Sequence, residues 1–174
     1  MIGHILLGIP WFWPSVAGSI LIATFAAGPL GRRLSIGTGL AWLFLMSLGG
    51  IASLTLTPGF EAFVEVHQRT CDFSLTGAPN LDAIRTINET SLNIALFVPL
   101  GASIALMARS PIKPVLATGA LALPLAIEAF QFAVPEFARQ CQVGDIASNL
   151  TGLIVGLGIG SVLGAVVGRR TALS

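Results

Sequence analysis

Apolar positions along this chain form long continuous runs and do not alternate with polar ones. A membrane-crossing helix needs about 20 predominantly apolar residues, whereas a membrane β-strand needs about ten with alternating polarity. The pattern therefore predicts an all-α, polytopic transmembrane helical bundle of about five helices with one larger outer loop, organised as a single domain over residues 1–174. The five runs are Ile9–Leu30, Ser35–Thr57, Thr90–Ala108, Val115–Val134 and Ile146–Gly168.

Composition supports a bilayer as the natural solvent. The chain is 54% hydrophobic and 10% charged, whereas soluble domains carry about 25% charged residues. The formal net charge is only +1, so the chain lacks the excess of basic residues that binds nucleic acid, and no nucleic-acid partner is expected. No basic residue precedes the first run, and Arg32 and Arg33 follow it. This order is the reverse of a secretory signal and predicts a retained first helix, although Pro10 and Pro14 leave a broken entry open.

Basic residues lie mainly on one side of this five-span layout. The positive-inside rule makes that side cytoplasmic, with the N-terminus outside and the C-terminus inside. The long loop 59–89 and the short loop 135–144 then face outward. Six of the nine basic residues define the cytoplasmic side: Arg32, Arg33, Arg109, Lys113, Arg169 and Arg170.

The two cysteines fall in the two predicted outer loops. Cys71 lies in the long loop and Cys141 in the short one. Disulfides persist on the oxidising side of a membrane, and a bridge here would close a long chain loop. We expect a Cys71–Cys141 disulfide; two unpaired thiols are the alternative.

Polar side chains gather at the outer ends of the third, fourth and fifth runs. Glu128 and Gln131 are three residues apart, and Asp145 and Asn149 are four apart, so each pair shares a helix face. Ionisable groups are costly within a bilayer and should face a partner or a wet cavity. These residues predict an outward-facing polar pocket; an ion pair that merely locks the bundle is the alternative. The predicted pocket residues are Asn93, Glu128, Gln131, Arg139, Asp145 and Asn149.

The candidate chemistry of this pocket is limited. Glu128 and Asp145 could serve as general acid and base. Arg139 could bind an anionic group of the substrate. Ser148 adjoins the polar stripe but has no histidine near it in sequence, so no activated nucleophile is visible. A metal site on two carboxylates would be under-liganded, and we expect neither a metal nor another cofactor.

The fifth run carries a glycine at every fourth position. Such a ridge lets a second helix approach backbone to backbone. The ridge continues the stripe of Asp145 and Asn149, so this stripe is expected to face protein and not lipid. The predicted packing glycines are Gly152, Gly156, Gly160 and Gly164.

Three segments together resemble the VanZ-like family of bacterial membrane proteins. They read NIALFVPLG from Asn93, EAFQF from Glu128 and RQCQVGDIASNLTGLIVG from Arg139, within a matching core of about residues 90–168. One position departs from the family pattern, because Gln142 stands where the pattern has its first aspartate. The resemblance implies an envelope protein of the bacterial cytoplasmic (inner) membrane, associated with resistance to glycopeptide antibiotics of the teicoplanin type.

Three functions remain open from the sequence. The first is binding of a membrane lipid, a lipid-linked envelope precursor or a lipoglycopeptide antibiotic in the outer pocket. The second is an intramembrane enzyme that modifies an envelope lipid or glycan, with Glu128 or Asp145 as the acid/base. The third is a purely structural role, with the polar residues as a helix lock. The oligomeric state is not predicted.

Overall fold

The computed structural model describes residues 11–59, 62, 69–74, 79, 88–107 and 111–172, with the backbone alone for 168–172. Five of its helices are long and apolar enough to cross a membrane, which confirms the predicted all-α transmembrane bundle. The helices are α2 (Phe12–Leu34), α3 (Thr38–Thr55), α5 (Glu89–Leu106), α6 (Lys113–Ala133) and α7 (Val143–Ala172). Shorter elements are β1 (Cys71–Asp72), η2 (Pro135–Phe137) and β2 (Cys141–Gln142).

The first helix is continuous over its described length. Pro14 lies in its first turn, where a proline removes no intrahelical hydrogen bond. The predicted end at Leu30 was too early, because the helix continues through Arg32 and Arg33 and closes on Ser35 in a left-handed conformation. Basic side chains in a last turn interact favourably with the helix dipole, so these arginines extend the helix. The predicted start, residues 9–10, lies outside the described residues.

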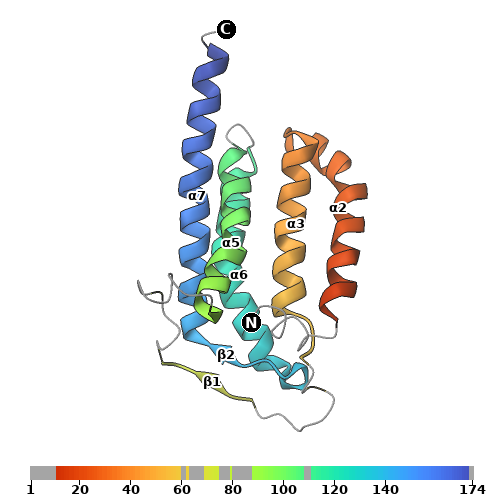
Figure 1. Cartoon of the computed structure of the whole chain (residues 1–174), viewed down its shortest axis with the longest axis vertical. Coiled ribbons are helices and arrows are strands. Elements are labelled where there is room, and N and C mark those ends of the chain that lie inside the picture. The colour runs from red at the N-terminus through yellow and green to blue at the C-terminus, as the bar shows by residue number, and fades with distance from the viewer. Residues whose placement is uncertain are drawn as a thin grey trace.

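The helices form two groups (Figure 1). Helices α2 and α3 pack as an antiparallel pair, and α5 packs along α7 with α6 beside them. Contacts between α3 and α5 join the two groups, and the buried core includes Phe44, Ile51, Phe97 and Leu100. The C-terminal ends of α3 and α6 and the N-terminal ends of α5 and α7 lie at one end of the bundle, which we call the pocket end.

Glycines allow α5 and α7 to pack at backbone distance. A Cβ on Gly156 would overlap the Val98 carbonyl oxygen, and one on Gly101 would overlap that of Leu153. The two helices are less closely packed at Gly164, near the C-terminal end of α5. A Cβ there would meet only the tip of the Leu106 side chain, at 3.9 Å. The ridge glycines that meet the α5 backbone closely are Gly152, Gly156 and Gly160.

A short parallel pairing of β1 with β2 covers the pocket end (Figure 1), a feature that the sequence did not predict. Cys71 lies opposite Cys141 in this pairing, and the two cysteines form the expected disulfide. The bridge joins residues 70 apart in sequence. It therefore fixes part of the long loop against the segment that leads from α6 into α7.

Candidate functional site

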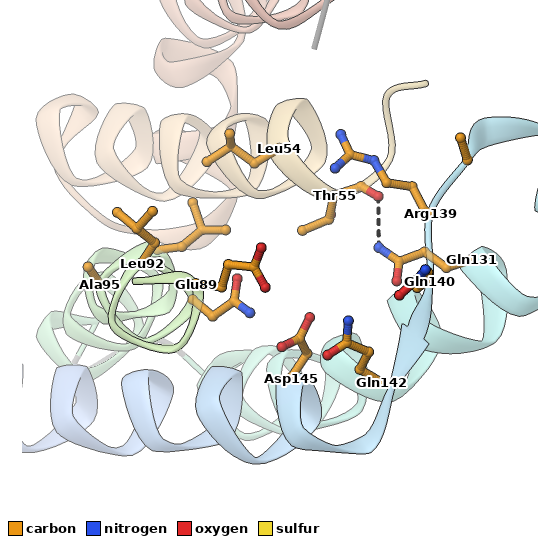
Figure 2. Close-up of a pocket in the computed structure, with 13 residues that line it drawn as sticks. Leu54, Thr55, Glu89, Leu92, Ala95, Gln131, Arg139, Gln140, Gln142 and Asp145 are labelled. Atoms are coloured by element: carbon orange, nitrogen blue, oxygen red, sulfur yellow. Dashed lines mark hydrogen bonds between the residues drawn. The ribbon is translucent and has the colours of Figure 1, made fainter. Parts of the chain in front are cut away.

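A cavity of about 530 Å³ lies at the pocket end, between α3, α5, α6 and the start of α7 (Figure 2). Four of the residues predicted for the pocket line it: Asn93, Gln131, Arg139 and Asp145. Two predicted residues, Glu128 and Asn149, do not. The other lining residues are Leu54, Thr55, Glu89, Leu92, Ala95, Leu96, Ala138, Gln140 and Gln142.

The cavity is polar on one side and apolar on the other. Figure 2 shows Gln131, Arg139 and Gln142 at the side formed by the link between α6 and α7. Leu54 and Leu92 lie at the opposite side, where α3 faces α5. Because α3 and α5 are membrane-spanning helices, the apolar side leads away from the end of the bundle and toward its interior.

Gln131 is positioned by the last residue of α3, and Arg139 by Thr57, two residues after it. The last carbonyl groups of a helix have no intrahelical donor. Gln131 Nε2 donates to the Thr55 carbonyl oxygen at 3.1 Å, and Arg139 Nε donates to that of Thr57 at 3.1 Å. A backbone bond from Gly59 N to the Phe137 carbonyl oxygen, at 2.9 Å, completes this junction. The junction explains why two strongly polar side chains lie at the membrane end of α3.

Each of these two side chains also keeps a buried polar atom with no hydrogen-bond partner. The atoms are Gln131 Oε1, an acceptor, and Arg139 Nη2, a donor. The Gln131 side chain is only 8% exposed. Burial also affects Arg139, because it lowers the pKa of the guanidinium from its ordinary value. The guanidinium nevertheless remains a cation, since arginine is not deprotonated in proteins. Buried polar groups are normally paired, so these two atoms mark a place for a polar ligand or for water.

Two carboxylates face the cavity from the first turns of neighbouring helices. Glu89 begins α5 and Asp145 lies in the first turn of α7, where acidic residues are favoured by the helix dipole. Figure 2 shows both side chains pointing into the same space. Asn93 lies within hydrogen-bonding reach of the Asp145 carboxylate. Helix α7 begins at Val143, so Asp145 lies inside the first turn and does not cap the helix.

Glu128 has a different role from the one predicted. It is 3% exposed, and its Oε2 accepts a hydrogen bond from the backbone N–H of Gln142 at 2.7 Å. Among the residues that the structure describes, no ion pair joins Glu128 to Arg139. Glu128 therefore anchors β2 to α6 from behind the cavity wall. The departure at Gln142 leaves this bond intact, because the backbone and not the side chain makes it.

Asn149 and Ser148 also lie outside the cavity. Asn149 is 2% exposed and its Oδ1 has no hydrogen-bond partner. The Ser148 hydroxyl donates to the Gly144 carbonyl oxygen at 3.0 Å within α7. Neither residue is in a position to contact a molecule in the cavity.

Sequence reasoning missed several lining residues, above all Glu89 and the end of α3. Glu89 follows Asn88, whose side chain caps α5 by accepting from Ser91 N at 2.9 Å. The Asn-Glu-Thr-Ser order at the start of an apolar run was therefore a signal that Glu89 begins a helix. The segment LTLTP, residues 54–58, carried no such signal, because Gln131 and Arg139 bond to its backbone carbonyl oxygens and Leu54, which lines the cavity, looks like any other apolar residue of the run.

Comparison with known proteins places this chain in a family. The model of the VanZ/LLP1 family matches residues 44–164, which is more than half of the chain. The chain belongs to the VanZ/LLP1 family. The VanZ/LLP1 match confirms the resemblance seen in the sequence and extends it toward the N-terminus, from about residue 90 to residue 44 in α3. It thus includes the α3 end that holds Gln131 and Arg139. No curated protein and no solved structure matches the chain.

Proposed function

We propose that this VanZ/LLP1 protein binds an amphiphile, with the polar head in the cavity and the apolar chain between α3 and α5. The observation that carries the proposal is the two-sided lining of the cavity. Arg139, Gln131 and Asp145 line it toward the pocket end, while Leu54 and Leu92 line it toward the bundle interior. Candidate ligands are a membrane lipid, a lipid-linked envelope precursor and the acylated part of a lipoglycopeptide.

The cavity is proposed to face outward from the bacterial cytoplasmic membrane. Two observations from opposite ends of the bundle support this orientation. The disulfide lies at the pocket end, and disulfides persist in oxidising compartments. Arg32, Arg33 and Lys113 lie at the other end, where the positive-inside rule puts the cytoplasm. A C-terminal reporter that is active only in the cytoplasm should be active, and an inactive fusion that is stably made would contradict this orientation.

An outward amphiphile site is our proposed link to resistance against teicoplanin-type antibiotics. The acyl tail of such an antibiotic and a lipid-linked envelope precursor are both amphiphiles of the kind that the cavity is proposed to hold. A protein that binds either the acyl chain or the lipid carrier would lower the amount of antibiotic bound to its target. Resistance would then depend on the same cavity as lipid binding.

The two alternative functions are less well supported by the geometry. An enzyme that uses Glu128 as acid or base would need that carboxylate in the cavity, whereas its Oε2 is bonded to the Gln142 backbone. A purely structural role accounts for the bonds of Gln131 and Arg139 to α3, but a helix lock needs no cavity of about 530 Å³ beside it.

A cavity-filling substitution tests the proposed function. Leu92→Trp adds bulk to the apolar side of the cavity, and Leu121→Trp adds the same bulk at an exposed position on α6. Native mass spectrometry of the full chain should show that co-purified lipid is lost from Leu92→Trp and kept by Leu121→Trp. Teicoplanin susceptibility should change in parallel. Equal lipid retention by both variants, with both still folded by thermal unfolding, would contradict the proposal.

A further inference from the structure

We infer that the cavity selects a zwitterionic head group that carries a primary ammonium and a phosphate, the chemistry of phosphatidylethanolamine. This inference rests on the proposed amphiphile-binding function and names the ligand class. It is carried by charges of opposite sign that share the cavity without pairing.

The unpaired charges are Glu89 and Asp145 on one wall and Arg139 on another. Figure 2 shows the two carboxylates beside the starts of α5 and α7, and Arg139 beside the end of α3. Within the described part of the chain, Arg139 makes no ion pair with either carboxylate. Its Nε is held by the Thr57 carbonyl oxygen, which fixes the guanidinium away from them. A ligand with both charges can satisfy both walls at once.

The carboxylate wall suits a primary ammonium. An –NH₃⁺ group has three hydrogen-bond donors and no acceptor. The cavity offers acceptors on Glu89 and Asp145, and it is also lined by Gln131, whose buried Oε1 has no hydrogen-bond partner. A quaternary ammonium donates no hydrogen bonds and is usually recognised by aromatic faces. None of the described residues that line the cavity is aromatic, so the wall favours ethanolamine over choline.

The arginine wall suits a phosphate. A guanidinium presents donors in a planar fork that matches phosphate oxygens. The Nε–H of Arg139 donates to the Thr57 carbonyl oxygen, whereas Nη2 is buried and has no hydrogen-bond partner. Since the cavity carries two carboxylates and one guanidinium, a head group with a net negative charge would be repelled, whereas a zwitterion is not. The cavity therefore disfavours phosphatidylglycerol.

Competition between lipids that share the same acyl chains tests the inference. The full chain, purified in mild detergent and stripped of lipid, is offered phosphatidylethanolamine, its N,N-dimethyl form, phosphatidylcholine and phosphatidylglycerol in equal amounts. Native mass spectrometry should show phosphatidylethanolamine bound about tenfold more than phosphatidylcholine, since charge-assisted hydrogen bonds to the ammonium are lost on methylation. The dimethyl form should fall between them.

Matched carboxylate variants locate the selectivity. Glu89→Gln, and independently Asp145→Asn, should lower the preference for phosphatidylethanolamine over phosphatidylcholine to near one. Glu136→Gln is the control, because Glu136 is also an exposed glutamate but does not line the cavity. Thermal unfolding of each variant reports whether it is folded. A preference that survives in both folded carboxylate variants would overturn the inference.

The possible outcomes separate this inference from the proposed function. Equal binding of phosphatidylethanolamine and phosphatidylcholine by the wild-type chain overturns the head-group inference and leaves amphiphile binding standing. Failure to bind any of the four lipids overturns both. Soluble glycerophosphoethanolamine, which keeps the zwitterionic phosphodiester, should compete poorly, because it lacks the chain that the apolar side would hold. If it displaced the lipid at equal concentration, the ligand would be a water-soluble aminoalkyl phosphate and the lipid assignment would be wrong.

Discussion

Glu128 accepts a hydrogen bond from the backbone N–H of Gln142, with 2.7 Å between Oε2 and N. This bond ties the last turns of α6 to β2, directly before α7 begins. It places the most deeply buried carboxylate of the described chain in the framework of the site and leaves Glu89 and Asp145 as the acids that face the cavity. The role of Glu128 is thus to hold the segment that carries several lining residues.

Removing the Glu128 carboxylate should destabilise the fold. Glu128→Ala leaves the Gln142 N–H without its acceptor in a part-buried position, which costs about 1–3 kcal/mol. Glu128→Gln keeps an acceptor oxygen and should lose less. Gln142→Ala retains the backbone N–H and should leave the free energy of unfolding near that of wild type. Denaturant titration in mixed micelles measures all three; equal stability of Glu128→Ala and wild type would contradict the assigned role.

The seam between α5 and α7 gives a second prediction, with its control on the same helix. A Cβ on Gly156 would overlap the Val98 carbonyl oxygen and come within 3.0 Å of Ala102 N, whereas one on Gly158 would meet nothing within 4 Å. Gly156→Ala should therefore cost about 1–3 kcal/mol through overpacking. Gly158→Ala should be neutral or stabilising by up to about 1 kcal/mol, because alanine is the better helix former. The same unfolding titration compares them, and similar values would contradict the close approach.

The sequence was sufficient for the bundle and for part of the site. Long apolar runs are a strong signal because the bilayer forces backbone polar groups to pair within each helix. The four-residue glycine period likewise indicated a helix seam. Helix ends were less accurate, since Arg32 and Arg33 look like a boundary in composition but are favourable inside the last turn of α2.

The partners of polar residues could not be predicted from spacing. Glu128 and Arg139 were natural candidates for an ion pair, yet each is bonded to backbone: Glu128 to Gln142 N and Arg139 to the Thr57 carbonyl oxygen. Every residue has these backbone groups, so no sequence pattern marks them. Glu89 was missed for a related reason, because its place in the cavity depends on how α5 and α7 begin side by side.

The junction at the end of α3 gives a third prediction. Gln131→Ala and Arg139→Ala each remove a donor from the carbonyl groups of Thr55 and Thr57. The last turn of α3 should then fray, because helix ends depend on partners outside the helix. Hydrogen–deuterium exchange of the peptide covering residues 52–59 should accelerate in both variants.

Gln140→Ala is the control for this junction. Gln140 lines the same cavity but is exposed, and it is not bonded to the carbonyl group of Thr55 at the end of α3 or to that of Thr57 just after it. Exchange at the α3 end should stay at the wild-type rate in this variant. Unchanged exchange in Gln131→Ala and Arg139→Ala as well would show that other contacts hold the end of α3.

Loss of the disulfide should weaken the whole pocket end. The Cys71–Cys141 bridge joins residues 70 apart in sequence, and restricting a loop of this length in the unfolded chain contributes about 4 kcal/mol. A double substitution to serine should therefore lower the free energy of unfolding by a few kcal/mol, and a reductant should do the same to the wild-type chain. The reductant should leave the double-serine variant unchanged, which separates the bridge from other effects of the reagent.

Because Gln140 and Gln142 flank Cys141 and line the cavity, lipid retention by native mass spectrometry should fall together with stability. Stability that did not respond to the reductant, with thiol labelling showing full reduction, would contradict a structural role for the bridge.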